Sequence, residues 1–279
     1  MTVVKASLVA VGLFVTSCLV IAQQSVSTTT VSADGAHLNL EQVLTNLEQR
    51  NAQRAAALEQ FEGTRVYRMQ YRGFPSNRDA EMVVKVNFRA PNSKEFTVVS
   101  STGSKFVIDH IFKKLLEGEQ EAAKGDNRHD TALTRENYDF ELAGFEPNNG
   151  GQYVLNLLPK TKNKFLYRGK IWVDAKDFAV VRIEGEPGKN PSIWIKKTDI
   201  AHSYKKVDNF WLPAENHTES FIRLGGKATL SIEYQDYKII KAAPLGAKTA
   251  SVGGEAALDG AASADTSLWA SHIGKRGVH

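Results

Sequence analysis

The stretch that decides the fold is KFLYRGKIWVDAKDFAVVRIEG, residues 164–185. Tyr167, Ile171 and Val173 fall on one face of an extended strand, because successive side chains point to opposite faces. The opposite face is mainly charged. AKDF supplies turn chemistry, and the residues after it predict a returning strand. The stretch therefore predicts a β-hairpin with one apolar face.

Further strand patterns surround this hairpin. Gly, Pro, Asn and Asp signals separate them, as is typical of antiparallel connections. Upstream the predicted strands are 64–72, 81–88, 95–101, 138–146 and 153–158, and downstream they lie within 191–207, 210–224 and 227–240, with a turn at 224–226. Strands this long, with few helical interruptions, predict a strongly curved antiparallel sheet or a partial barrel.

Two segments carry helical periodicity instead. In the first, Asn39 and Gln42 predict an N-terminal capping box, and apolar residues at helical spacing continue to about Phe61. The second, residues 104–125, presents a broad apolar stripe opposite charged side chains. The stripe consists of Val107, Ile108, Ile111, Phe112, Leu115 and Leu116.

Both ends of the chain differ from this middle part. Lys5 and the apolar run after it are typical of a secretory signal over residues 1–22. Cleavage after Ala22 would remove Cys18, the single cysteine; alternatively, Cys18 is lipidated and anchors the protein. Residues 23–37 indicate a flexible linker, and the Ala/Gly-rich residues 242–279 indicate a disordered tail.

Patterns typical of catalysis or metal binding are missing from the sequence. It contains no HExxH, GxSxG, P-loop or CxxC motif. His202 and His217 stand alone, which favours structural or surface roles, and the spacing of Asp174 and Asp177 favours a turn over paired catalytic carboxylates. The sequence predicts no enzyme, no cofactor and no metal site.

The charge of the chain is small. The formal net charge is +4, and loss of the leader with Lys5 leaves 4 − 1 = +3. So mild a charge gives little support to nucleic acid as a partner.

Three tryptophans fall on three separate predicted strands: Trp172, Trp194 and Trp211. Core packing and the lining of a ligand cavity both remain open for them.

The order of these elements resembles the LolA/LolB superfamily of lipoprotein carriers. YRGKIWVDAKDFAVVRIEGEP, followed by WIKK and FWLPAENHTES, resembles outer-membrane lipoprotein-sorting proteins, and the resemblance covers residues 38–241. It implies an α+β, mainly β fold: a strongly curved, unclosed antiparallel half-barrel with helices covering its concave face. It also implies a periplasmic carrier that holds acyl chains of lipoproteins or other lipids in an apolar cavity.

The resemblance extends to site residues and partners. It implies that the second helix, with Ile108, Ile111, Phe112, Leu115 and Leu116, is a lid, and that the three tryptophans are candidates for the cavity wall. The family's carrier latches its lid through an arginine; Arg65, Arg68 and Arg72 all lie near the matching strand, and the sequence does not choose between them.

The implied partners are lipid acyl chains, an inner-membrane donor complex and an outer-membrane acceptor, with the carrier a monomer. The alternative is a lipid-sensing module of the cell envelope that acts through a protein partner.

The pattern at the N-terminus generates a first prediction. Mass spectrometry of protein purified from the cell envelope should find a mature N-terminus at about Gln23, because the apolar run ends at Ala22. A diacylglycerol-modified Cys18 at the N-terminus would instead establish the membrane-anchored form.

Overall fold

The computed structural model describes residues 37–122, 131–190, 192–223 and 225–245, apart from residue 92. These residues all fall in the compact unit that begins at His37. The predicted signal, nearly all of the linker, Cys18 and most of the C-terminal tail lie outside the described residues. Leu224, in the predicted turn 224–226, also lies outside them.

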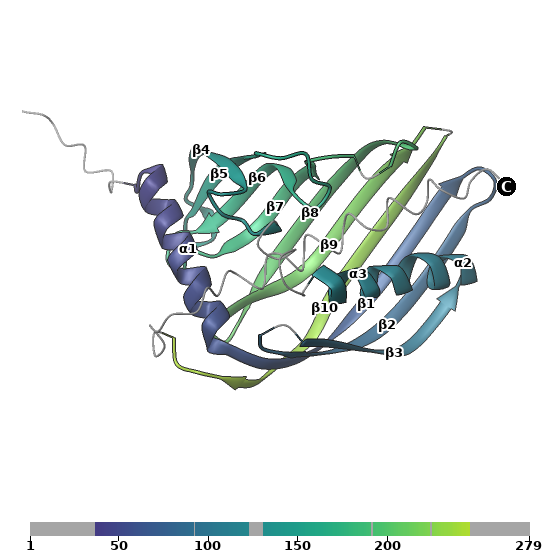
Figure 1. Ribbon diagram of the computed structural model, residues 1–279, viewed down its shortest axis with the longest axis horizontal. Helices are drawn as coiled ribbons and strands as arrows, with labels where there is room; N and C mark the ends of the chain where they lie inside the picture. The colour runs from purple at the N-terminus through teal and green to yellow at the C-terminus, as the bar shows by residue number, and fades with distance from the viewer. Residues whose placement is uncertain (1–36, 92, 123–130, 191, 224, 246–279) are drawn as a thin grey trace, which may run out of the picture. The chain divides into compact units, whose positions relative to one another are not determined.

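The described unit is built on one ten-stranded sheet, in which all neighbours pair antiparallel (Figure 1). The strand order is β3-β2-β1-β10-β9-β8-β7-β6-β5-β4, so β3 and β4 form the two edges and the sheet does not close. The strands are β1 Leu58–Gly73, β2 Arg78–Arg89, β3 Ser93–Gly103, β4 Tyr138–Glu146, β5 Gln152–Pro159, β6 Tyr167–Asp174, β7 Val180–Pro187, β8 Ile195–Val207, β9 Phe210–Ile222 and β10 Gly226–Ala242. The predicted fold class is confirmed.

The first helix, α1 (Leu40–Ala57), has the predicted capping box. The Asn39 side chain accepts from the Gln42 amide, and the Gln42 side chain accepts from the Asn39 amide. The prediction that the helix continues to Phe61 is wrong, because β1 already begins at Leu58. Phe61 pairs with β2 and β10 and stacks on Phe88, so sheet pairing overrides the helical period.

The second helical segment is one run of three parts. It comprises α2 (Lys105–Val107), a π-helical turn η1 (Ile108–Phe112) and α3 (Lys113–Ala122). The sequence predicted a single helix over 104–125; residues 123–125 lie outside the described part. A π turn widens the helix locally and shifts which side chains share a face after it.

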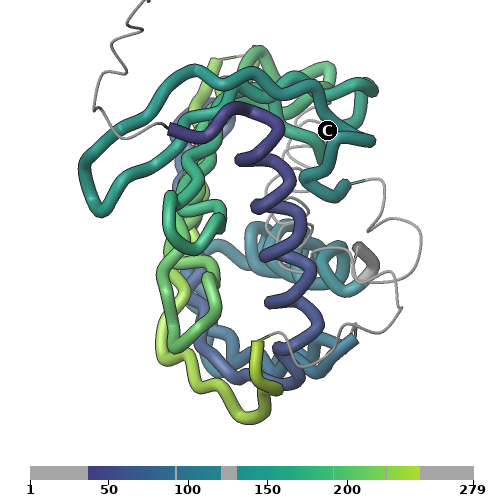
Figure 2. The backbone as a smooth tube through the Cα atoms, turned by 90° about the vertical axis from the view of Figure 1, so that its left-hand side faces the viewer, coloured from purple at the N-terminus to yellow at the C-terminus, as the bar shows by residue number. Residues whose placement is uncertain are grey.

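Both helical segments lie on the same side of the curved sheet (Figure 2). Val43, Leu44 and Leu47 of α1 pack with the core residues of β4 to β8. The η1–α3 run packs with the core residues of β1, β2 and β10. Each helix removes from water the apolar side chains that the alternation of the strands places on this concave face.

The β6–β7 hairpin is closed by turn chemistry, as predicted. The Asp174 carboxylate accepts from the amides of Lys176 and Asp177, and the described residues 171–183 contain no helix. The Asp177 carboxylate accepts from the Trp211 indole at 2.9 Å and from Lys206 at 2.6 Å. Burial raises the pKa of Asp177, but these hydrogen bonds outweigh it and leave the pKa lowered, so the carboxylate stays charged. The two aspartates therefore build the turn.

Arg54 of α1 ties the helix to this hairpin. Its guanidinium donates to the carbonyl oxygens of Asp177 and Phe178, each at 2.8 Å, and the residue is 5% exposed. Arg54→Ala should lower the free energy of unfolding by about 2 kcal/mol, because two carbonyls lose their donor away from solvent. Urea unfolding measures the change.

Arg50→Ala is the matched control on the same helix. Arg50 is exposed and its side chain reaches Gln53 only at 3.5 Å. Its loss should change the free energy of unfolding by less than about 0.5 kcal/mol. Equal effects of the two variants would contradict the role given to Arg54.

Candidate functional site: the concave face and its covering helix

The five helix residues predicted from the sequence come together over the sheet. Phe112 and Leu115 are fully buried, Ile111 and Leu116 are buried, and Ile108 is half-buried at the margin of the same cluster. The ring of Phe112 lies 5.9 Å from that of Tyr67 on β1, centroid to centroid. The apolar stripe thus faces the sheet, as its spacing predicts.

A buried ion pair fixes the same helix to the sheet. Glu119 of α3 is 0% exposed, and its carboxylate accepts from both terminal nitrogens of Arg65 on β1, at 2.5 and 2.9 Å. Lys94 on β3 donates to the same carboxylate at 2.6 Å. A carboxylate held by two cations is stable away from water only while these contacts persist.

The aromatic surroundings hold Arg65 in place. Its guanidinium carbon lies 4.9 Å from the centre of the Tyr234 ring and 5.4 Å from that of Phe96. A planar guanidinium packs well against ring faces. The cluster of Arg65, Glu119 and Lys94 is called the latch below.

Within the described residues, Arg65 is the one of the three candidate arginines that contacts the covering helix. Arg68 points to the opposite face of β1, where it pairs with Glu81 and Glu233, and Arg72 pairs with Asp79. Glu119 was not predicted from the sequence. A signal was present: Glu119 follows Ile111 and Leu115 at spacings of four, so a carboxylate continues the apolar stripe and needs a buried partner.

A row of buried polar side chains crosses the middle of the concave face. On β9 it contains Asn216, Thr218 and Ser220, all 0% exposed, and on β8 it contains Thr198 and His202, each 3% exposed. Thr198 pairs across the strands with Ser220, and His202 pairs with Asn216. These five residues are called the polar row.

Register places the polar row between apolar neighbours. Ser220 and Thr218 lie opposite Ala228 and Leu230 of β10, which belong to the cluster under α3. On the other side, His202 lies opposite Ile183 of β7, which belongs to the cluster under α1. The concave face is therefore two apolar areas divided by a polar band.

His202 is part of the structural network of this row. Its Nε2 lies 3.2 Å from the Tyr167 hydroxyl and 3.4 Å from the Asn216 side-chain nitrogen. Burial lowers the pKa of His202 from 6.5 to about 3, so the imidazole is neutral at physiological pH. The prediction that it has a structural role agrees with this environment.

The three tryptophans do not join the helix residues. Trp172 lies on the face of β6 opposite Ile171, and its indole donates to Glu146 at 3.1 Å. Trp211 packs partly against the same outer group and partly against the core cluster under α1, and its indole donates to Asp177. The prediction that Trp194 lies on a strand is wrong, because it occupies the turn that precedes β8.

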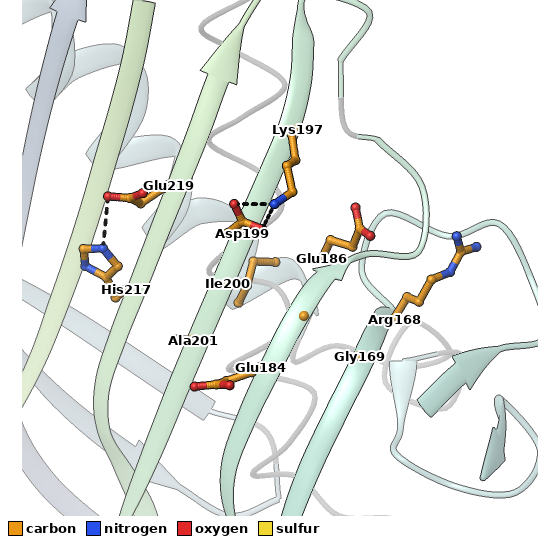
Figure 3. A pocket seen from close by; sticks show the side chains of 11 residues that line it. Arg168, Gly169, Glu184, Glu186, Lys197, Asp199, Ile200, Ala201, His217 and Glu219 are labelled. Atoms are coloured by element: carbon orange, nitrogen blue, oxygen red, sulfur yellow. Dashed lines mark hydrogen bonds and ion pairs between the residues drawn. The ribbon is translucent and has the colours of Figure 1, made fainter. Parts of the chain in front are cut away.

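The convex face carries a groove of about 750 Å³ over β6 to β9 (Figure 3). Lys197 and Asp199 of its lining form an ion pair at 2.7 Å, and Glu219 accepts from Lys227 at 2.5 Å. The groove is lined by Arg168, Gly169, Glu184, Gly185, Glu186, Lys197, Asp199, Ile200, Ala201, His217 and Glu219. Since much of this charge is paired at the surface, the face stays hydrated and contrasts with the apolar concave face.

Two features are absent from the part of the chain that the structure describes. There, no group of three or more His, Cys, Asp or Glu residues is arranged to hold a metal ion. No helix within the same residues has both the length and the apolar character needed to cross a membrane.

No model of a known protein family and no curated protein matches the chain. Solved structures of similar fold include a domain assigned as an outer membrane lipoprotein-sorting protein from Vibrio parahaemolyticus, with 12% identity and a TM-score of 0.37 over 72% of this chain and 94% of that one. A LolA superfamily protein from Nitrosomonas europaea has 11% identity and a TM-score of 0.31 over 75% and 96%. A DUF1329 family protein from Desulfovibrio piger has 13% identity and a TM-score of 0.35 over 71% and 93%.

Two of these three solved structures carry names from the superfamily that the sequence resembles.

The buried histidine generates a prediction about pH. The folded protein does not protonate His202 until about pH 3, whereas the unfolded chain protonates it near 6.5. Stability must therefore fall as the pH drops through 6.5, by roughly 2 kcal/mol between about pH 7.5 and pH 5. Urea unfolding at several pH values measures this slope.

His202→Gln should flatten the slope, because glutamine offers hydrogen bonds without titrating. His217→Gln, at an exposed position on the other face, is the control and should retain the slope. The carboxylates with lowered pKa, such as Asp109 and Glu219, lose their charge only at lower pH and do not disturb this window. A slope that survives in His202→Gln would contradict the assignment.

Proposed function

We propose that this protein is a carrier of the bacterial cell envelope that shields acyl chains of lipoproteins or other lipids against its concave face. The observation that carries the proposal is the covering helix, whose apolar stripe packs on the sheet while a buried ion pair holds it there. An apolar face closed by a separate, latched element can exchange its own helix contacts for those of a ligand.

The energetics of such a carrier require no catalytic group. Each methylene moved from water to an apolar surface contributes about 0.8 kcal/mol, so a few acyl chains supply ample affinity. The helix competes for the same surface, because Ile111, Phe112 and Leu115 already occupy it. Loading is then an exchange, in which α3 leaves and the acyl chain takes its place.

The latch sets how easily this exchange occurs. Opening α3 separates Glu119 from Arg65 and Lys94, and all three charged groups then regain water. Hydration offsets most of the lost attraction, so a buried ion pair can be a reversible fastening. Membrane delivery follows the reverse order, with latch closure expelling the chain. The proposed location is the periplasm, where the predicted signal would direct the protein.

A second candidate function is a lipid-sensing module that acts through a protein partner. It is favoured by the link between the latch and an edge of the sheet: Lys94 lies on the edge strand β3, and its carbonyl oxygen accepts from Gln120 of α3 at 3.2 Å. Val98 and Val99 on the same strand are 48% and 56% exposed. Delivery of bound lipid to acceptor vesicles distinguishes a carrier from a sensor that keeps its ligand.

The latch provides the test of the lid. Glu119→Gln keeps the shape of the side chain but removes the negative charge that Arg65 and Lys94 share, at a cost of about 3 kcal/mol to the closed state. Amide hydrogen exchange in α3 should accelerate by roughly 100-fold, while β8 and β9 keep their protection. Release of a fluorescently labelled diacyl lipid should be slower, because the weakened latch competes less well with the bound chain.

Glu81→Gln serves as the matched control, because Glu81 pairs with Arg68 on the outer face, where both side chains are partly exposed. It should leave exchange and release unchanged. If Glu119→Gln accelerates exchange in α3, β8 and β9 together, the helix belongs to a solid core and the lid is contradicted.

A further inference from the structure

Thr198 and Ser220, called the hydroxyl pair of the polar row, carry two hydroxyl protons but share only one hydrogen bond. The Thr198 and Ser220 hydroxyl oxygens lie 2.8 Å apart, so one donates to the other. Each hydroxyl carries one proton, and no second side-chain hydrogen bond of either residue is present in the described part of the chain. One proton of the pair is therefore available, in a place where both residues are buried.

The rest of the row is occupied by its own contacts. Thr218 donates to the Asn216 side-chain oxygen at 3.1 Å, and the Asn216 nitrogen and the Tyr167 hydroxyl both approach His202. The hydroxyl pair is thus the part of the row that can serve an additional acceptor. A buried donor without an acceptor is destabilising, and a ligand that brings a carbonyl oxygen supplies the missing acceptor.

The position of the pair matches the border between two parts of a lipid. Ser220 lies opposite Ala228 of the cluster under α3, while Ile200, two residues beyond Thr198 on the same strand and face, belongs to the cluster under α1. Hydrocarbon placed on the area under α3 brings the group at its end next to the polar row.

The polar row is uncharged, and this favours a neutral ligand group over an anionic one. His202 is neutral, and none of the five residues of the row carries a charge at neutral pH. The buried cations of this face, Arg65 and Lys94, are engaged with Glu119. A carboxylate or a phosphate would lose its hydration here without a counter-charge, whereas a neutral carbonyl oxygen needs only one donor.

We infer that the Thr198–Ser220 hydroxyl pair recognises the ester carbonyl of an acylated lipid held on the concave face. This inference rests on the proposed carrier function and adds to it the chemical class of the cargo: ester-linked acyl lipids are preferred over ether-linked lipids of the same chain length.

The test compares two ligands that differ only in the linkage. Equilibrium binding of a neutral diacylglycerol and of its dialkyl ether analogue is measured on the full mature chain. The wild type should bind the ester about 10-fold more tightly, the equivalent of one hydrogen bond. The double variant Thr198→Val with Ser220→Ala should bind both ligands equally, with its affinity for the ether unchanged.

Ser231→Ala is the matched control, because Ser231 lies on the outer face of β10, opposite His217, and should keep the ester preference. Equal binding of ester and ether by the wild type would overturn the inference and leave the carrier function intact. Binding of neither ligand would overturn the carrier function itself. The wild-type comparison needs no variant, so a double variant that fails to fold does not remove the test.

Discussion

A curved sheet with one apolar face cannot stand alone in water, and the structure follows from how that face is covered. Two helical segments share the task, α1 over the half from β4 to β8 and the η1–α3 run over β1, β2 and β10. The two coverings are fastened differently. Arg54 attaches α1 to backbone carbonyls of the β6–β7 turn, whereas a buried ion pair between Glu119 and Arg65 holds α3. The two covers therefore differ in the chemistry that fastens them to the sheet.

The two faces of the sheet also differ in how their charged and polar groups are placed. The convex face carries ion pairs in contact with water, such as Arg68 with Glu81 and Glu233, and these contribute little to stability. The concave face contains the latch and the polar row, where each polar contact has lost its water. Polar groups in such a place are costly unless satisfied, so they fix the arrangement of the elements more strictly than apolar contacts alone.

Much of the fold could be predicted from the sequence, because alternation and helical spacing are local signals. Tyr167, Ile171 and Val173 share a face in the structure as they do in the pattern. Local signals failed where distant pairing decided the outcome. Leu58 and Phe61 fit a helix by spacing, yet they pair with β10, which lies near the other end of the domain. Trp194 directly precedes Ile195, the first residue of β8 that pairs with β9, and therefore lies in the turn before the strand.

The candidate site was predictable in part. The apolar stripe of the covering helix gave five residues that the structure brings together. Glu119 and the hydroxyl pair were missed, because single-residue preferences place glutamate and serine at the surface. Glu119 and Ser220 become part of the site through residues on other elements, Arg65 for Glu119 and Thr198 for Ser220. Local sequence patterns do not reveal such partners.

The pairing of β1 with β10 has a consequence for the order in which the protein can fold. The first strand, β1, pairs along its length with the last strand, β10, from Leu58 opposite Ala242 to Gly73 opposite Gly226. During synthesis β1, β2 and β3 emerge early, but their link to the rest of the sheet does not exist until Ala242 has been made. The covering helix packs on β10 as well, so its closed position also waits for the last strand. Contacts so distant in sequence make folding slow. The concave face of the early strands therefore stays uncovered until β10 has been made.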